Sequence, residues 1–431
     1  MRKTTLNLLL LYCACAAGIF PLPVLAADTE LEERIDSYLQ PYLEIGHLSG
    51  TILVAKSGKI VYQKSFGLAD HELDVTNTKR TRFGIGSVNK PMTIVILARL
   101  IEEGKLALSD KLSEYAPEFP RGDEITVEHL LNHSSGIAHR VTSDLDETQP
   151  QTAATMLALA AKSELVFEPG ADSVYSSAGF SVLARVLEIA SGESYSALLE
   201  RYVLIPAGMA ETSDAGSREI IKRRAKAYFF DTAGLVNAPA GDVSYLVGAG
   251  SVFSTPADLY AMQRTLVVGE FGELASTALV RENGSLSWNG SAAGYRTFAD
   301  FDAESGISLI MASNLTSGAI DRIREAVPAI AAGADVPIPA AINAAAVDVD
   351  ASVLESYQGF YQLRPGRNLQ LRVTEGRVTM DDWLLIPVAQ ATFFSPQDYA
   401  EISVVTGTDG TVERLDWKIG DSVYPLPRID P

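Results

Sequence analysis

Cysteine and histidine are scarce in this sequence of 431 residues, which contains two cysteines and five histidines. Both cysteines, Cys13 and Cys15, lie close to the amino terminus, so the rest of the chain can form no disulfide and carries no thiolate nucleophile. His129 and His133 have the i, i+4 spacing of a zinc pair, but no third ligand accompanies them, and we expect a structural role at a helix end. No Gly-x-Ser-x-Gly motif occurs, which argues against a Ser-His-Asp triad. We therefore expect no metal and no cofactor.

Basic residues are also few: 35 lysines and arginines stand against 54 aspartates and glutamates, and the formal net charge is −19. A surface of this charge repels nucleic acids and anionic membranes and favours solubility. We see no basic patch, and no second long apolar run follows the one at the amino terminus. We therefore expect no nucleic acid partner and no stable membrane insertion, and the sequence leaves the oligomeric state open.

The first 26 residues have the pattern of a secretory signal peptide. Arg2 and Lys3 precede the apolar residues 6–11, small residues follow, and Val24-Leu25-Ala26 resembles an A-x-A cleavage site. Two prolines interrupt the run, which is also short for a membrane span. Its removal would take away two basic and no acidic residues, so the formal charge would change from −19 to −21. We therefore expect a periplasmic or secreted protein.

The composition changes near residue 333 and indicates two folded parts. Residues 333–352 are rich in Ala, Pro and Val without an amphipathic period, which is typical of a linker. Before it, strand-like runs at both ends flank a helical middle, so we expect one α+β domain over residues 27–332 whose ends share a sheet. After it, over residues 353–431, hairpin turns separate short β-type runs and predict a small antiparallel sheet or barrel. The runs are 358–363, 369–374, 377–380, 400–405 and 412–418.

Ser87 and Lys90 form the most informative pair in the chain. They lie just ahead of residues 92–101, an apolar run with helical spacing that stops at Gly104. A serine and a lysine three residues apart on a helix lie on the same face. A lysine in that position can take the proton of the serine if burial and neighbouring charge lower its pKa. S-x-x-K occurs by chance in many chains, so the pair gains its meaning from the motifs that follow it.

A second motif, Tyr175-Ser176-Ser177, follows the turn Glu168-Pro169-Gly170 and precedes an apolar helical run that ends at Gly192. A tyrosine on a loop at the start of a helix can reach into a cleft. There it can act as a general base, either as a phenolate or by sharing a proton with a lysine. On its own, Tyr175 would more often be a packed aromatic residue with its hydroxyl facing outward.

Together these blocks resemble the serine beta-lactamase and penicillin-binding-protein superfamily, above all its class C-like branch with the family VIII carboxylesterases and D-stereospecific peptidases. The resemblance covers about residues 30–330 and implies a beta-lactamase/transpeptidase-like antiparallel sheet flanked by helices. The tail resembles the small lipocalin-like β domain that often follows such catalytic domains. Four blocks occur in the family order, at residues 87–90, 130–136, 168–192 and 250–259.

The resemblance implies a serine hydrolase mechanism. Ser87 would be the acylated nucleophile, Lys90 and Tyr175 would form the base that activates it, and Tyr175 would protonate the leaving group. The third family motif is usually Lys-Thr-Gly on a strand that lines the cleft, and its counterpart here is Trp288-Asn289-Gly290. The backbone N–H groups of Ser87 and Ser291 would form the oxyanion hole, in which each donor is worth about 3–4 kcal/mol.

Two positions depart from the family pattern. Ser177 stands where the second motif normally has an asparagine that bridges the lysine and the substrate amide, and serine is too short to make both bonds. Trp288 replaces the cation or polar donor that engages a substrate carboxylate. A site without that cation should favour neutral apolar esters over β-lactams and acyl-D-Ala-D-Ala. Tryptophan also occurs at this position in the family VIII esterases.

Three functions remain open. We expect an exported serine hydrolase that cleaves carboxylic esters through an acyl-Ser87 intermediate, with Ser177, Trp288, Gly290 and Ser291 around its small-molecule substrate. The first alternative is a beta-lactamase, or a peptidase of the same fold acting on D-amino-acid or peptidoglycan peptides. The second is a catalytically weak relative that binds cell-wall fragments or a protein partner. The intact Ser87, Lys90 and Tyr175 argue against this last function, because a binding protein does not need all three.

Overall fold

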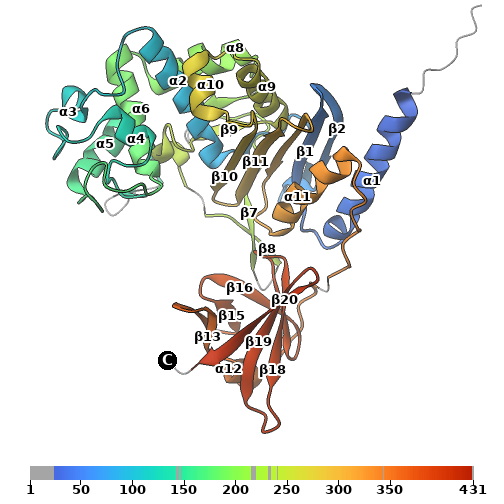
Figure 1. Cartoon of the computed structure of the whole chain (residues 1–431). Helices are drawn as coiled ribbons and strands as arrows, with labels where there is room; N and C mark the ends of the chain where they lie inside the picture. Colours follow the sequence, from blue (N-terminus) through green and yellow to red (C-terminus); the bar gives the residue numbers. More distant parts are fainter. Residues whose placement is uncertain are drawn as a thin grey trace, which may run out of the picture.

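The computed structural model describes residues 24–141, 145–146, 148–214, 220–231, 234–239, 241–342 and 344–429. They form a mixed helix-and-sheet domain followed by a closed β-barrel (Figure 1). Of the expected signal peptide, residues 1–26, all but the last three residues lie outside the described part of the chain. The expected linker falls on residues 334–350, where the described residues form neither helix nor strand.

Most helices come from the middle of the chain, and the first domain also begins and ends with a helix. No described helix is both long enough and apolar enough to cross a membrane. The α-helices are α1 (Val24–Glu44), α2 (Asn89–Glu102), α3 (Leu112–Tyr115), α4 (Val127–Leu131), α5 (Ala153–Lys162), α6 (Ser177–Ser191), α7 (Tyr195–Leu199), α8 (Ile205–Ala207), α9 (Pro256–Val267), α10 (Glu273–Leu279), α11 (Ala319–Ala332) and α12 (Ala351–Ser356). Tighter or wider turns are the 3-10 turns η1 (Gly86–Val88) and η3 (Val243–Leu246) and the π turn η2 (Glu200–Leu204).

The first domain is built on a five-stranded antiparallel sheet in the order β10-β11-β12-β1-β2. Its strands are β1 (Gly50–Lys56), β2 (Lys59–Phe66), β10 (Leu286–Ala292), β11 (Tyr295–Asp302) and β12 (Ile307–Ser313). Strand β1 pairs with β12, with Ile52 opposite Met311. The two ends of the domain therefore share one sheet, which confirms the expected α+β class. Short strands complete the domain: β3 (Leu68–Asp70), β4 (Val75–Thr76), β5 (Phe83–Gly84), β6 (Ser213–Asp214), β7 (Tyr228–Asp231), β8 (Gly234–Asn237) and β9 (Val252–Ser254).

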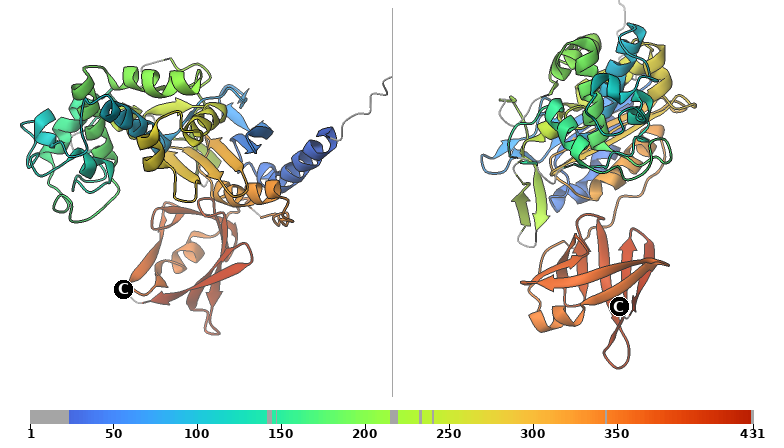
Figure 2. Two further views of the ribbon diagram at one scale, coloured as in Figure 1. Left: turned by 45° about the horizontal axis from the view of Figure 1, so that its top comes forward. Right: turned by 90° about the vertical axis from the view of Figure 1, so that its left-hand side faces the viewer.

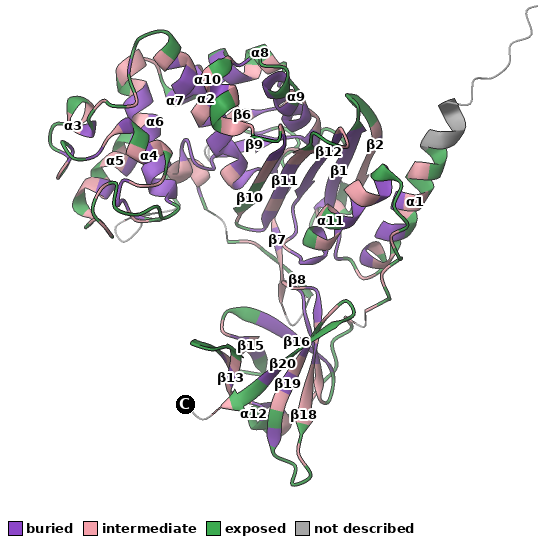
Figure 3. Cartoon of the chain, viewed as in Figure 1, coloured by how far each residue is buried: buried purple, intermediate pink, exposed green. Residues whose placement is uncertain are grey.

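The central strands are buried on both faces because helices cover both sides of the sheet (Figure 3). Successive side chains of a strand point to opposite faces. Accordingly, Leu53 packs into the core formed with α2 and α9, whereas the neighbouring Ile52 packs into the core formed with α1 and α11. Fully burying one such side chain stabilises a fold by about 1.5–3 kcal/mol. The two cores fix the sheet, and with it the edge strand β10.

The second domain is a closed antiparallel barrel in which each strand pairs with the next. Strand β13 also pairs with β20, with Phe360 opposite Ile429, so the barrel has no open edge. Its interior includes Trp417, which is 5% exposed, while Trp383 lies near the surface. The strands are β13 (Gly359–Arg364), β14 (Arg367–Thr374), β15 (Arg377–Met380), β16 (Trp383–Ala389), β17 (Thr392–Ser395), β18 (Ala400–Thr406), β19 (Val412–Ile419) and β20 (Ser422–Ile429).

The barrel packs directly against the first domain and is not merely tethered to it (Figure 2). Leu384, Ile386 and Phe394 of the barrel belong to the same core cluster as the inner faces of α1 and α11. Gly318, just before α11, donates its backbone N–H to the Pro396 carbonyl at 2.8 Å. A Cβ at position 318 would lie 2.3 Å from the Gln397 carbonyl oxygen, so this close approach requires glycine.

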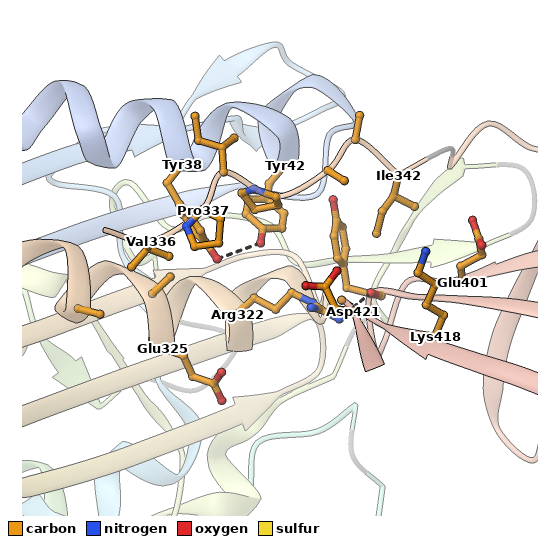
Figure 4. A pocket seen from close by; sticks show the side chains of 18 residues that line it. Tyr38, Tyr42, Arg322, Glu325, Val336, Pro337, Ile342, Glu401, Lys418 and Asp421 are labelled. Atoms are coloured by element: carbon orange, nitrogen blue, oxygen red, sulfur yellow. Dashed lines mark hydrogen bonds between the residues drawn. The ribbon is translucent and has the colours of Figure 1, made fainter. Parts of the chain in front are cut away.

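A cavity of about 660 Å³ lies where the linker crosses the junction of the two domains. Figure 4 shows the hydroxyls of Tyr38 and Tyr42 joined by a hydrogen bond of 3.3 Å, with Pro337 of the linker beside them. Charges of both signs line the same space, among them Arg322 from α11 and Asp421 from the barrel. None of the sequence motifs described above lines this cavity.

The hairpin of β7 and β8 connects the first domain to the barrel (Figure 1). The ring of Phe230 stacks on His47 with centroids 4.0 Å apart, inside the core that the two domains share. Asp231, next along the strand, forms an ion pair with Arg377 of the barrel at 3.3 Å. The preceding residue, Phe229, lines a cleft of the first domain. One short strand therefore contacts the cleft, the shared core and the barrel.

Candidate active site

Ser87 lies in the 3-10 turn η1, which runs directly into α2. The sequence predicts Ser87 and Lys90 on one α-helical face, and the structure corrects this for the serine, which precedes the α-helix. The turn begins at Gly86, whose φ of +51° is a conformation that favours glycine. The Ile85 N–H donates to the Val252 carbonyl at 3.0 Å, which ties the turn to β9. Ser87 is therefore held on a tight turn at the start of a buried helix.

The first turn of α2 is fixed by a buried hydrogen-bond network around Tyr195. The Asn89 side-chain amide donates to the Tyr195 hydroxyl at 2.9 Å, and this hydroxyl lies 2.7 Å from the hydroxyl of Thr93. Thr93 in turn donates to the Gly248 carbonyl at 2.6 Å. Buried hydrogen-bond networks of this kind rigidify a core, although Asn89 Oδ1 has no hydrogen-bond partner among the described residues. They hold the backbone that carries Lys90.

Lys90 is a buried amine that has no carboxylate partner among the described residues. Only 5% of the residue is exposed, and its Nζ donates to Ser87 Oγ at 3.3 Å, to Ser177 Oγ at 3.2 Å and to the Ala249 carbonyl at 3.0 Å. All three partners are neutral, so none offsets the cost of removing the charge from water. Burial therefore lowers the pKa of Lys90 from 10.5 to about 7.

Tyr175 also contacts Ser87. Its hydroxyl donates to Ser87 Oγ at 2.5 Å, and its ring lies 4.7 Å from Lys90 Nζ. His133 and His139 pack on the tyrosine ring with centroids 4.7 and 5.4 Å away. Burial of the phenol raises the pKa of Tyr175, although hydrogen bonds with Ser87 and Ser177 oppose the effect. Tyr175 therefore stays protonated at neutral pH.

Helix α6 begins immediately after Tyr175. Ser176 caps it by accepting the Gly179 N–H at 2.8 Å, and Gly192 ends it with a φ of +76°. Ser177, the first residue of the helix, is 6% exposed and keeps the bond to Lys90. The serine thus makes the lysine contact that an asparagine would make, while it is too short to reach a substrate amide as well.

Strand β10 lies directly against the turn that carries Ser87. A Cβ at Gly290 would lie 1.9 Å from the Ile85 carbonyl oxygen and 3.0 Å from the Ser87 nitrogen. A Cβ at Gly86 would lie 2.8 Å from the Ser291 nitrogen. Two glycines therefore allow the backbones of η1 and β10 to approach, and the amide groups of Ser87 and Ser291 line the same space. The oxyanion hole expected from these two N–H groups stays a prediction.

These elements enclose a cleft of about 750 Å³. The predicted residues Ser87, Lys90, Tyr175, Ser177, Trp288 and Ser291 all line it, and Gly290 supports it from β10. The structure therefore brings together the whole predicted set, although the roles given to these residues remain predictions. Trp288 presents its side chain to this cleft without any cation from the third motif.

The comparison with known proteins agrees with this architecture. The family model named Beta-lactamase matches residues 35–333, which is more than half of the chain. The chain belongs to the beta-lactamase family.

Two relatives and one solved structure illustrate the similarity. The Bacillus subtilis protein PbpX, whose name places it among penicillin-binding proteins, is 31% identical over 258 residues, 60% of this chain and 64% of that protein. Teichoic acid D-alanine hydrolase of Staphylococcus aureus is 28% identical over 227 residues, 53% of this chain and 55% of that protein. The crystal structure of a penicillin binding protein from Bacillus halodurans has a TM-score of 0.60 and 25% identity, covering 68% of this chain and 99% of that chain. This beta-lactamase-family chain spans between about half and two thirds of the length of the two relatives.

The cleft also contains residues that the sequence analysis did not single out. His139 and Arg140 line it from the loop between α4 and α5, and Phe229 lines it from β7. His133, expected to be structural, lies at the same site, because its Nδ1 accepts the Ser176 N–H at 3.2 Å. Burial lowers the pKa of His133 to about 4, so its ring is neutral. His129, the other half of the zinc-like pair, instead accepts the Thr126 N–H within the cap of α4.

Proposed function

We propose that this protein is a serine hydrolase that cleaves carboxylic esters through an acyl-Ser87 intermediate. The observation that supports the proposal best is the pair of hydrogen bonds at Ser87 Oγ, one from Lys90 and one from Tyr175. With a pKa of about 7, a large share of Lys90 is a neutral amine at neutral pH and can accept a proton. The sequence left Lys90 and Tyr175 as a joint base. The raised pKa of Tyr175 favours Lys90 as the base and Tyr175 as the acid.

In the proposed reaction, Ser87 Oγ attacks the ester carbonyl carbon while its proton passes to Lys90 Nζ. The carbonyl oxygen takes up the electron pair and receives hydrogen bonds from the N–H groups of Ser87 and Ser291. The bond to the alcohol then breaks, and the alcohol leaves with a proton from the Tyr175 hydroxyl, which Lys90 replenishes. Water attacks the acyl carbon with Lys90 again as the base, and the acid leaves as Ser87 regains its proton.

Two features support esters over amides. Ser177 cannot bind Lys90 and a substrate amide at once, and Trp288 offers an apolar face where a cation would hold a substrate carboxylate. An alcohol also leaves more readily than an amine, so cleavage of an ester depends less on substrate contacts at positions 177 and 288. Hydrolysis of β-lactams or D-amino-acid amides through the same Ser87 is the alternative reaction.

The test is steady-state hydrolysis of p-nitrophenyl butyrate and of a chromogenic cephalosporin by residues 27–431, with labelling by a fluorophosphonate. Ser87→Ala is expected to abolish labelling and to lower ester turnover by orders of magnitude. Ser173→Ala is the matched control, because Ser173 lies on the same loop as Tyr175 but its hydroxyl donates to the Asn132 carbonyl, away from Ser87 and Lys90. Turnover of the cephalosporin in preference to the ester would replace the ester proposal with the amide alternative. Absence of labelling would overturn both.

We also propose that the protein is exported. The proposal rests on the sequence pattern of residues 1–26, and its test is the amino-terminal sequence of the protein recovered from the periplasm or medium. A sequence that begins at Ala27 is expected, and one that begins at Met1 would contradict export by cleavage.

A further inference from the structure

The loop that carries Arg140 is fastened to the start of α6. The Ser176 hydroxyl donates to the Ala138 carbonyl at 2.9 Å, the Ser177 N–H donates to His139 Nδ1 at 3.3 Å, and the Ala178 N–H donates to the His139 carbonyl at 3.2 Å. These bonds belong to the same helix start that places Ser177 beside Lys90. The backbone leading to Arg140 is therefore fixed relative to the candidate catalytic groups.

The charge of Arg140 is unpaired within the described part of the chain. Arg140 is exposed, lines the cleft, and forms neither an ion pair nor a side-chain hydrogen bond with any described residue. Some arginines of the domain have carboxylate partners, such as Arg82 with Glu211 at 2.6 Å and Arg324 with Asp300 at 2.6 Å, whereas Arg281 also has none among the described residues but lies outside the cleft. In a chain with 54 acidic residues, a cation left without a partner at a cleft is available to a ligand.

The surroundings of Arg140 also favour an anion. None of the described residues that line the cleft is an aspartate or a glutamate. The other cation of the cleft is Lys90, and the ring of His139 lies close enough to Arg140 and Lys90 that both help to lower its pKa, after burial. A cleft lined by basic side chains and by no carboxylates has a positive local electrostatic potential. It therefore attracts anionic ligands, even in a protein of negative net charge.

We propose that Arg140 binds an anionic group of the substrate, a carboxylate or a phosphate, at the end remote from the reacting carbonyl. The inference rests on the proposed hydrolase function and names its substrate class: esters that carry a negative charge. The planar guanidinium suits this role because its N–H groups match both oxygens of a carboxylate or phosphate. Arg140 thus supplies, from the loop between α4 and α5, a cation that the third motif lacks at Trp288. The preference for neutral esters that Trp288 suggested then no longer holds, and the preference for esters over amides rests on Ser177.

The experiment compares two esters of equal length, the p-nitrophenyl monoester of glutarate and p-nitrophenyl valerate, in wild type, Arg140→Gln and Arg140→Lys. We expect Arg140→Gln to lower the ratio of kcat/KM for the anionic ester to that for the neutral ester at least tenfold, mainly through KM. Arg140→Lys should restore part of the ratio, and raised salt should reduce the wild-type ratio. Arg281→Gln, at an exposed arginine outside the cleft, is the matched control and should leave the ratio unchanged.

A second measurement tests anion binding by Arg140 without relying on ester turnover. Glutarate and inorganic phosphate are titrated into the Ser87→Ala protein and into Ser87→Ala/Arg140→Gln, and binding is followed by calorimetry. Binding that weakens at least fivefold in the double variant supports the proposal, and the tighter of the two ligands identifies the anion. An unchanged ratio of the two esters together with unchanged binding overturns the role of Arg140 but leaves the ester hydrolase standing. If the wild type does not turn over either ester but anion binding still depends on Arg140, the proposed hydrolase function is overturned and the role of Arg140 in binding stands.

Discussion

The low pKa of Lys90 leads to a prediction for both rate and stability. If neutral Lys90 is the base, kcat/KM for a neutral ester should rise with pH along a limb centred near pH 7, because the amine must lose its proton first. The pKa values of the other titratable groups around Ser87 move away from pH 7: that of His133 is lowered to about 4, that of His139 is lowered, and that of Tyr175 is raised. The limb can therefore be assigned to one residue.

The same burial makes Lys90 costly for the fold. A pKa lowered from 10.5 to about 7 corresponds to about 5 kcal/mol, at about 1.36 kcal/mol per pH unit. Lys90→Met removes this cost but leaves the Ala249 carbonyl without its partner, which costs about 1–3 kcal/mol. We expect Lys90→Met to raise the free energy of unfolding by about 2–4 kcal/mol below pH 7. The gain should shrink as the pH rises towards 10.5, because the unfolded wild type then holds a proton that the folded state has released.

The assay pairs a pH–rate profile with denaturant unfolding. Rates are read at the isosbestic wavelength of p-nitrophenol, so that its own titration does not distort the limb. Lys90→Met should lose ester turnover by orders of magnitude while its unfolding midpoint increases. A wild-type rate that stays flat from pH 6 to pH 8.5 would refute the assignment of Lys90 as the base. A variant that is both inactive and less stable would refute the argument that the buried charge is costly.

Three further predictions concern the acid, the oxyanion hole and an ion-pair cluster. Tyr175→Phe should lower kcat/KM at least tenfold more for an alkyl ester than for a p-nitrophenyl ester, because only the poorer leaving group needs a proton, and equal losses would contradict this role. Gly290→Ala places a Cβ 1.9 Å from the Ile85 carbonyl oxygen and should cut kcat/KM about 10²-fold without a change in circular dichroism, whereas an unchanged rate would contradict the packing. Arg80 and two further arginines lower the pKa of Glu211 from 4.5 to about 2, so Glu211→Gln should cost about 1–3 kcal/mol at pH 7. Denaturant unfolding should show this loss fading as the pH falls from 4.5 towards 2, and a loss independent of pH would exclude the ion pairs as its cause.

Much of the first domain could be predicted because its signals are local. The run after Lys90 and the run that ends at Gly192 have helical spacing, and they form α2 and α6. The family resemblance then supplied what local pattern could not, namely that Ser87 and Tyr175, 88 positions apart, meet at one site. Arg140 was missed because an exposed arginine in a loop carries no periodic signal. Its position depends on hydrogen bonds to another part of the chain.

The barrel was predicted in outline, but strands β16, β17 and β20 were not. Strand β16 lacks the alternation of a surface strand, because Leu385 faces the barrel core while Leu384 and Ile386 face the first domain. Strands β16 and β20 also contain prolines, and proline in a run argues against a central strand. In β16, the register of pairing with β17 shifts just after Pro387. Because β16 is buried against both the barrel core and the first domain, its sequence does not alternate between apolar and polar residues, and that alternation is the signal by which a strand is recognised.

The hairpin of β7 and β8 makes the two domains poor candidates for exchange. Phe229 faces the cleft, Phe230 stacks between the domains, and Asp231 is held by Arg377 of the barrel. A chimera that took its barrel from a relative would have to keep a cation at position 377 and an apolar surface against Phe230. Without them, the strand that places Phe229 at the cleft would lose its outer support, and we expect the selectivity of the proposed reaction to change although no residue of the cleft has been altered. Under the proposed function, the barrel therefore helps to determine substrate selectivity through its contact with the hairpin.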